Sequence, residues 1–337
     1  MKTLEYNSNV KPIKVKSFFK RFSMIIYALI FLLNCIIINA TAATTPVENN
    51  HYYIRNVGTG KYLTVVNYSS DSLSAYLVQQ TLHYYSTQSF QLVNKITQNN
   101  LEYYELLSND CYTQLRVDVD NANDSDGTNI KVFKRNPSYI GAQQFCFMSN
   151  GDGTFRIKPQ ISNNRVLEVV NGSTAENTII QLYTYKGLDH QKWEIVNANY
   201  FLNSYDLVDS GKHIDWENNS TFSSTVIESA TQIWNSYKPG VLREDNAFRI
   251  RDLEIENDSS MPYLGLTYSS GLIKLSDSLV FQSDACVATV LAHEFGHTLG
   301  LDHINDPDQL MNHTYTKNFN SLNRYDELSY DKAYTLY

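Results

Sequence analysis

The order of apolar and polar residues divides the chain into three parts. An uncharged apolar run, Met24 to Ile38, lies near the start. Between residues 51 and 197, short alternating apolar stretches are separated by Asn, Gly, Asp and Ser, a pattern typical of strands joined by turns. From residue 204 onward, stretches with helical spacing appear among the strand-like ones. The chain is therefore predicted to be a multidomain protein, with an all-β region followed by an α+β region.

The apolar run near the start has the features of a secretory signal peptide. Basic residues precede it, and Ala40-Thr41-Ala42 follows it as a small-residue cleavage site. A retained membrane anchor is the alternative, but the run has about fifteen residues, whereas a spanning helix needs about 20. We expect residues 1–42 to be removed, the protein to be secreted and extracellular, and no stable membrane span to remain.

The all-β region contains three similar units. The triplets Gln88-Ser89-Phe90, Gln143-Gln144-Phe145 and Gln191-Lys192-Trp193 recur at spacings of 55 and 48 residues. Each is preceded, 23 to 25 residues earlier, by a strand-like segment that contains Thr64, Asp118 or Glu168. A repeat of roughly fifty residues predicts one supersecondary unit per repeat, hence an all-β domain with pseudo-threefold symmetry over residues 51–197.

These Q-x-W repeats resemble the ricin-type β-trefoil lectins, with the third unit most similar. The resemblance implies glycans or glycoproteins as partners, bound by an acidic residue, an aromatic ring and polar side chains. By position, these roles fall to Glu168, Gln181 and Tyr183 in the third unit and to Asp118 and Phe133 in the second. Glu168 and Tyr183 are expected at the surface, and the Q-x-W residues in the core and turns. The chain departs from the family pattern at Lys186, where Asn is usual, and at Thr64, where an acid is usual.

Residues 204–337 are predicted to form the α+β domain. Apolar and aromatic residues at positions 226, 227, 230, 233, 234 and 237 lie on one face of a helix with a Ser N-cap that ends at Pro239-Gly240. Alternating stretches at 211–216, 247–255 and 265–275 predict strands. A nearly all-apolar helix, capped by Asp284 and running to Thr298 or Leu299, must be buried.

That buried helix carries a candidate metal site. His293 and His297 lie four residues apart and so on one helical face, where two ring nitrogens suit two corners of a zinc tetrahedron. Gly300 can stop the helix in a left-handed conformation, which lets His303 return as a third ligand. Glu294 is placed beside the first ligand to take a proton from water. The pattern predicts one catalytic zinc ion and leaves calcium open.

The eleven-residue string HEFGHTLGLDH resembles the metzincin zinc endopeptidases, and most closely their matrixin branch. The resemblance implies a Met-turn at Met311 below the zinc, a closing helix within 321–337, and an edge strand within 265–275 to which an extended peptide substrate adds. Some metzincins carry a Tyr two residues after the Met, where this chain has His313. An oxyanion role and an exposed turn are both open for His313, and we expect the exposed turn.

Composition and charge restrict the function further. The chain has 337 residues, 42% of them hydrophobic, and a net charge of −8. Residues 1–42 contain six basic groups and one acidic group, so the remainder carries 21 basic and 34 acidic groups, a net −13. This sign argues against a nucleic-acid partner. Cys111 and Cys146 are close enough in sequence to pair, and Cys286 is expected to be a buried thiol.

Three functions fit these features. The first is a secreted zinc metalloendopeptidase that hydrolyses peptide bonds of proteins and is targeted to glycans or glycoproteins by its trefoil. The alternative is a carbohydrate-binding adhesin or toxin component with a structural or vestigial zinc site. The third is a protease whose trefoil serves only as a folding partner or a protein-docking surface.

Overall fold

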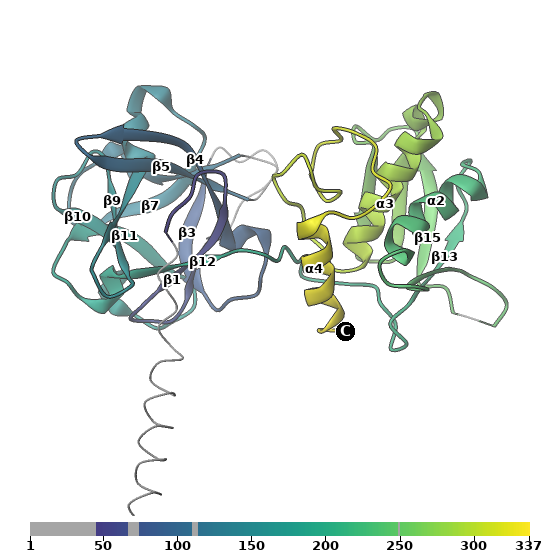
Figure 1. The fold of residues 1–337 in the computed structure, drawn as a ribbon, viewed down its shortest axis with the longest axis horizontal. Helices are drawn as coiled ribbons and strands as arrows, with labels where there is room; N and C mark the ends of the chain where they lie inside the picture. The colour runs from purple at the N-terminus through teal and green to yellow at the C-terminus, as the bar shows by residue number, and fades with distance from the viewer. Residues whose placement is uncertain (1–44, 67–73, 110–113, 249) are drawn as a thin grey trace, which may run out of the picture. The chain divides into compact units, whose positions relative to one another are not determined.

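The computed structural model describes residues 45–66, 74–109, 114–248 and 250–337. The predicted signal peptide and Cys111 lie outside these residues. By their contacts, residues Thr44–Tyr337 form one compact unit. Two folded regions within it correspond to the all-β and α+β regions expected from the sequence; we call them the N-terminal lobe and the C-terminal lobe (Figure 1).

The N-terminal lobe is all-β, as predicted. The described residues of this lobe form 12 strands, which belong to one antiparallel sheet. The hairpins β2–β3, β6–β7 and β10–β11 pair with one another through β3–β7, β7–β11 and β3–β11. The strands are β1(His51–Asn56), β2(Tyr62–Val66), β3(Ser74–Gln80), β4(Ser89–Gln98), β5(Leu101–Ser108), β6(Arg116–Val119), β7(Thr128–Phe133), β8(Gln144–Ser149), β9(Phe155–Pro159), β10(Arg165–Val169), β11(Thr178–Thr184) and β12(Trp193–Asn197).

Three fully buried glutamines hold equivalent turns of this lobe. The side-chain nitrogens of Gln88, Gln143 and Gln191 each donate to a backbone carbonyl at 2.9 Å. Their side-chain oxygens each accept a backbone N–H at 2.7 or 2.8 Å. Since a buried amide must have partners for both ends, these turns are specified by the glutamine. The aromatic residue of each triplet is also fully buried, as the sequence predicts.

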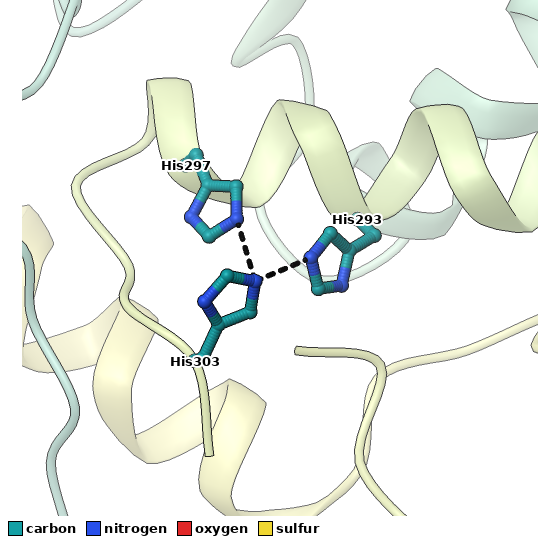
Figure 2. Close-up of side chains that lie close together, drawn as sticks. All are labelled: His293, His297 and His303. Carbon is teal, nitrogen blue, oxygen red and sulfur yellow. Dashed lines mark hydrogen bonds between the residues drawn. The ribbon is translucent and has the colours of Figure 1, made fainter. Parts of the chain in front are cut away.

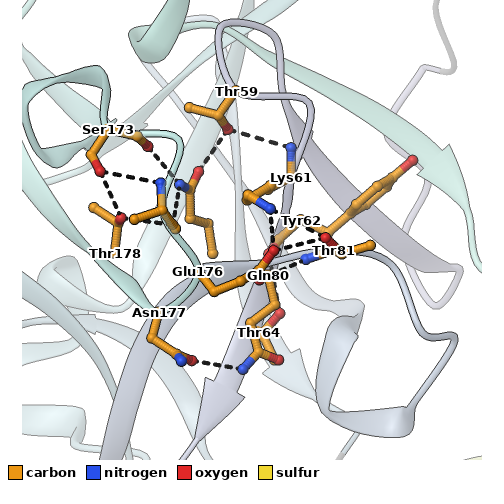
Figure 3. A network of polar contacts seen from close by, with 12 residues as sticks. Thr59, Lys61, Tyr62, Thr64, Gln80, Thr81, Ser173, Glu176, Asn177 and Thr178 are labelled. Carbon is orange, nitrogen blue, oxygen red and sulfur yellow. Dashed lines mark hydrogen bonds and ion pairs between the residues drawn. The ribbon is translucent and has the colours of Figure 1, made fainter.

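A polar network joins the hairpin β2–β3 to the loop before β11 (Figure 3). Lys61 forms an ion pair with Glu176, whose other oxygen accepts the backbone N–H of Thr81 at 3.0 Å. The side chain of Gln80 donates to Asn177 at 2.7 Å. These polar groups are hydrogen-bond and ion-pair partners of one another. The network therefore links two segments about a hundred residues apart in sequence, and its role is structural.

The C-terminal lobe packs helices on a five-stranded sheet of order β14-β13-β15-β17-β16. The strands are parallel except β16, which pairs antiparallel with β17 and forms an edge. Figure 1 shows α2 and α3 alongside β13 and β15. The elements are β13(Ile214–Asn218), α2(Ser224–Asn235), β14(Leu242–Glu244), β15(Leu253–Asp258), β16(Gly265–Tyr268), β17(Leu272–Ser276), α3(Asp284–Thr298) and α4(Arg324–Tyr334).

Three local predictions for this lobe were wrong in detail. Residues 265–275 form a hairpin of two strands, because Gly271 adopts a φ of 87° and turns the chain. The strand predicted at 247–255 occupies only Leu253–Asp258. The cap of α3 is Ser283, whose hydroxyl accepts the N–H of Cys286 at 3.3 Å, so Asp284 is the first helical residue.

Two cysteines and the apolar faces of the helices are part of the buried interior. Cys146 and Cys286 are free and buried, as expected for Cys286. The core of the C-terminal lobe includes the inner faces of the sheet, α2, α3 and α4.

Among the helices in the described ranges, none combines the length and the apolar character that crossing a membrane requires.

Candidate metal centre

The end of α3 determines where the third histidine lies. Gly300 has a φ of 82°, its N–H donates to the carbonyl of His297 at 3.1 Å, and the N–H of Leu301 donates to the carbonyl of Gly296 at 3.0 Å. This bond pair is a Schellman motif, which reverses the chain after a helix. The turn brings His303 back to face His293 and His297, as the sequence predicts.

The three histidines converge on one point (Figure 2). Nε2 of His303 lies 3.1 Å from Nε2 of His293 and 3.2 Å from Nε2 of His297. In a tetrahedral site with Zn–N bonds of about 2.0–2.1 Å, two ligand nitrogens lie about 3.3–3.4 Å apart. The spacing therefore fits a metal ion, and these three residues could hold one.

The opposite ring nitrogens of the two helical histidines are fixed by the backbone. Nδ1 of His293 lies 2.8 Å from the carbonyl oxygen of Leu310, and Nδ1 of His297 lies 2.9 Å from that of Leu301. A carbonyl accepts only, so each Nδ1 carries the proton and each Nε2 presents a lone pair. Burial lowers the pKa of His293 to about 3 and that of His303 well below its usual value, which keeps both rings neutral.

Glu294 lies beside this centre, under the edge strand. It is 5% exposed, and its carboxylate accepts the hydroxyl of Thr267 at 2.7 Å. Burial raises its pKa. A Cβ atom at Gly265 would lie 2.5 Å from Oε1 of Glu294, so a larger residue at this position of β16 would have to displace the carboxylate. The sequence pattern did not reveal the contacts of Thr267 and Gly265 with Glu294.

Met311, the residue of the expected Met-turn, packs against Gly296 of the helix that carries two of the histidines. It is 1% exposed, and a side chain at Gly296 would collide with its sulfur and with the ring of Trp234. The carboxylate of Asp326 in α4 accepts the N–H groups of Leu310 at 2.8 Å and Met311 at 3.1 Å. Asp326 stands three residues after Asn323, and the two form a capping box at the start of α4, a helix-capping signal that is visible in the sequence.

A cavity of about 660 Å³ opens onto the histidines and Glu294. It is bounded on one side by residues 262–267 and on the other by residues 312–317. His313 lines this cavity and is half-buried, so the expectation of an exposed turn residue was wrong. Burial lowers its pKa, and its Nδ1 has no hydrogen-bond partner within the described ranges.

The sugar-site residues predicted in the third unit lie together on the hairpin β10–β11. Glu168 faces Gln181 across the hairpin and accepts its amide at 2.6 Å, and it accepts the amide of Gln191 at 2.7 Å. The expectation that Glu168 lies at the surface was wrong, because it is 4% exposed. Tyr183 is half-buried, and the Lys186 ammonium lies 4.9 Å from its ring centroid.

The predicted sugar-site residues of the second unit also lie on one hairpin. Asp118 is 7% exposed, and burial raises its pKa to about 6. Phe133 lies on the same hairpin, β6–β7, and the ammonium of Lys131 lies 4.8 Å from its ring centroid. In both units a lysine ammonium lies over the ring face on which a sugar would stack.

Comparison with known proteins agrees with this geometry. Residues 187–335 match the family model for matrixin. Residues 40–133 match the model for ricin-type β-trefoil lectin domain-like sequences. The N-terminal lobe thus has a β-trefoil-like lectin fold, and the C-terminal α+β lobe is compatible with a matrixin domain. No curated protein matches the chain.

Several solved structures are similar to the N-terminal part. A designed threefold-symmetric protein, ThreeFoil, is 28% identical over 44% of this chain and 98% of its own, with a TM-score of 0.39. The Macrolepiota procera ricin B-like lectin, solved with lactose, is 18% identical over 46% and 99%, with a TM-score of 0.36. An exo-β-1,3-galactanase from Clostridium thermocellum is 24% identical over 45% and 31%, with a TM-score of 0.40.

Proposed function

We propose that this protein is a zinc-dependent endopeptidase that hydrolyses peptide bonds of proteins. The observation that supports this most is the convergence of three histidine Nε2 atoms beside a buried carboxylate in one cavity. The matrixin match over residues 187–335 supports the same class of enzyme. His293, His297 and His303 would hold one zinc ion, and Glu294 would be the catalytic residue.

The edge strand β16 is suited to bind the substrate backbone. Among the described strands it pairs only with β17, so its other edge presents unpaired N–H and C=O groups. Residues of this strand also line the cavity. An extended peptide that adds to this edge would cross the cavity beside Glu294, which favours cleavage within a chain over cleavage of small molecules.

The chain's own groups can perform the proton transfers of hydrolysis. When bound, zinc supplies a Lewis acid that polarises the peptide carbonyl and makes water more acidic. The Glu294 carboxylate removes a proton from the attacking water as the C–O bond forms. It then gives that proton to the leaving nitrogen as the C–N bond breaks. The hydroxyl of Thr267 holds the carboxylate in place during both transfers.

Cleavage of casein or gelatin by the purified protein tests this function. Hydrolysis is expected with zinc bound, to stop after treatment with a zinc chelator, and to return when zinc is added back. Proteolysis that survives complete removal of the metal would overturn the proposal.

We infer a glycan- or glycoprotein-binding role for the N-terminal lobe as the targeting part of this function. Its support is the match to the lectin family model. The candidate sugar-binding residues remain Asp118, Phe133, Glu168, Gln181 and Tyr183. A lysine ammonium lies over each of the two aromatic rings, Phe133 and Tyr183. A glycan array probed with the zinc-loaded protein tests this role: binding supports targeting, and its absence favours a purely structural lobe.

Secretion is a separate proposal that rests on the residues before the described range. The basic and apolar segments in residues 1–42 predict a signal peptide. Expression in a secreting host followed by N-terminal sequencing should find the protein outside the cell, beginning near Ala43. A chain that stays in the cell with its first residues intact would contradict this.

The alternative function is a carbohydrate-binding adhesin or toxin component with a structural or vestigial zinc site. Its support is the lectin-like lobe. A structural zinc is normally closed by four protein ligands, whereas here three histidines face a cavity. Glycan binding without any peptide cleavage would favour this alternative.

A further inference from the structure

The segment that carries the third histidine has little regular structure of its own. Between the Schellman turn at Gly300 and the Met-turn, residues 302–305 belong to no helix or strand. Single β-bridges join Leu301 to Leu202 and Ile304 to Asn312. The position of His303 must therefore be set by contacts that surround this segment.

The first such contact comes from the N-terminal lobe. Ser86 lies at the start of the short helix η1(Ser86–Gln88) and is 3% exposed. Its hydroxyl donates to Oδ2 of Asp302 at 2.6 Å. Oδ1 of the same carboxylate accepts the backbone N–H of His303 at 2.7 Å. Two hydrogen bonds thus link the N-terminal lobe to the backbone of the predicted zinc ligand.

The second contact comes from Asn109, directly after β5. Its side chain is fully buried, and its amide nitrogen donates to the carbonyl of His303 at 3.3 Å. Its amide oxygen accepts the N–H of Asn305 at 3.0 Å. Asn109 is itself anchored, because its backbone N–H donates to the carbonyl of Ser89 at 3.0 Å. A single side chain therefore satisfies one backbone group on each side of Ile304, as a neighbouring strand would.

The packing around these bonds is continuous with the core of the C-terminal lobe. Tyr53 of β1 is buried in that core, and its hydroxyl donates to the carbonyl of Tyr200. The N–H of Leu202 donates to the carbonyl of Tyr84 at 3.0 Å. The connection after residue 197 is thus a packed segment, which holds Ser86 and Asn109 at a defined place.

We propose that Ser86 and Asn109 of the N-terminal lobe are positioning residues for the metal centre, so that this lobe sets the zinc affinity of the C-terminal lobe. The inference rests on the proposed zinc site. It assigns the lectin-like lobe a role within the catalytic unit that needs no sugar. Groups that orient metal ligands typically change metal affinity by about 10–100-fold when removed.

Zinc affinity, measured by competition with a chromogenic chelator, tests this proposal without any substrate. In the full chain, Ser86→Ala and Asn109→Ala combined are expected to weaken zinc binding by about 10–100-fold. Ser125→Ala combined with Asn163→Ala, two exposed positions of the same lobe, serves as the matched control and should leave zinc affinity unchanged. Wild-type affinity in the Ser86/Asn109 variant would overturn the proposal.

Milder variants separate positioning from general stability. Ser86→Thr keeps the hydroxyl and is expected to bind zinc more tightly than Ser86→Ala. Asn109→Asp keeps the acceptor for Asn305 but puts a carboxylate oxygen in place of the donor to His303, so it should weaken zinc binding although Asn305 keeps its partner. If these variants lower the melting temperature of the metal-free protein yet bind zinc normally, the contacts are only structural.

The same experiment separates this inference from the proposed function. If wild-type protein binds zinc through the three histidines but cleaves no peptide, the proposed function fails and the positioning role stands. If His303→Ala binds zinc as wild type does, the metal site itself is assigned wrongly, and both proposals fail.

Discussion

Gly265 of the edge strand lies directly against the carboxylate of Glu294, so that even one additional carbon atom on Gly265 would approach Oε1 to 2.5 Å. Two residues further along the same strand, Thr267 donates its hydroxyl to the same carboxylate at 2.7 Å. The strand proposed to bind substrate therefore also defines where the Glu294 carboxylate lies. In the proposed mechanism, substrate binding and proton transfer would share one structural element.

Gly265→Ala is expected to displace Glu294 while leaving zinc bound. A misplacement of about 1 Å at a catalytic group costs on the order of 100-fold in rate, so kcat should fall by about that factor. Tyr268→Ala, at the end of the same strand, is the control and should cost far less. The measurement is steady-state peptide hydrolysis together with zinc content. Normal kcat in Gly265→Ala would show that the carboxylate can move without consequence.

Glu294→Gln removes the base and keeps the size of the side chain. Loss of a general base typically lowers the rate by about 100-fold to 10,000-fold. Because Glu294 is not expected to be a ligand, zinc content and melting temperature should stay near wild type. The variant should still bind extended peptides along β16, which fluorescence anisotropy of a labelled peptide can measure. Near-normal hydrolysis with zinc bound would contradict the mechanism.

Site residues that lie close together in the sequence could be predicted, whereas contacts between residues far apart in the sequence could not. His293, Glu294 and His297 follow from helical spacing, and the return of His303 follows from Gly300, since all lie within eleven residues. Thr267 and Asp326 were missed because their contacts span long stretches of sequence: 27 residues from Thr267 to Glu294, and 16 and 15 residues from Asp326 to Leu310 and Met311. A local pattern does not contain such pairings.

The wrong predictions have similar causes. Alternation of apolar residues continues through 265–275, so the pattern reads as one strand, and only the positive φ of Gly271 divides it. Glu168 has the residue type of a sugar ligand. Its carboxylate can nevertheless be buried, because the side-chain amides of Gln181 and Gln191 donate hydrogen bonds to it. Asn109 lies 194 residues before the histidine whose carbonyl it binds. The threefold symmetry of the repeat stays a prediction.

His297→Ala should abolish zinc binding. A ligand that binds only the folded state at about 1,000 times its Kd stabilises that state by about 4 kcal/mol, so wild-type protein should lose several degrees of melting temperature on chelation. The melting temperature of His297→Ala should not respond to zinc or chelator. His83→Ala, an exposed histidine of the N-terminal lobe, is the control and should keep the zinc response. One bound zinc per chain in His297→Ala would refute the ligand assignment.

Glu168→Ala is expected to destabilise the N-terminal lobe. It removes the acceptor of two side-chain amides, and leaving buried groups without partners costs about 1–3 kcal/mol. Glu194→Ala is the matched control, because Glu194 forms a partly exposed ion pair with Arg55, and surface pairs of this kind contribute about 0–1 kcal/mol. Thermal unfolding of both variants is the measurement. An unchanged melting temperature of Glu168→Ala combined with lost glycan binding would instead identify Glu168 as a sugar ligand.

His51 should make the protein less stable in acid. Its ring is buried edge-on against Phe201 and Tyr325, at centroid distances of 5.4 and 6.0 Å, and its Nδ1 has no hydrogen-bond partner within the described ranges. Burial lowers the pKa of His51 from 6.5 to about 4. Below pH 6.5 the unfolded chain therefore binds a proton at His51 that the folded chain does not bind. The contribution of the neutral, buried His51 to the free energy of unfolding is fully present above pH 6.5 and is lost as the pH falls toward 4.

His51→Phe keeps an aromatic ring at this place and removes the titrating group. Each pH unit between the two pKa values costs wild type about 1.4 kcal/mol through this residue, and the variant should be free of that cost. The free energy of unfolding, measured between pH 4 and 8, should therefore decline less steeply in His51→Phe, and the two proteins should differ least above pH 6.5. Because both retain His293 and His303, the difference between the curves isolates His51. Parallel curves over the whole range would mean that His51 takes up its proton within the folded protein.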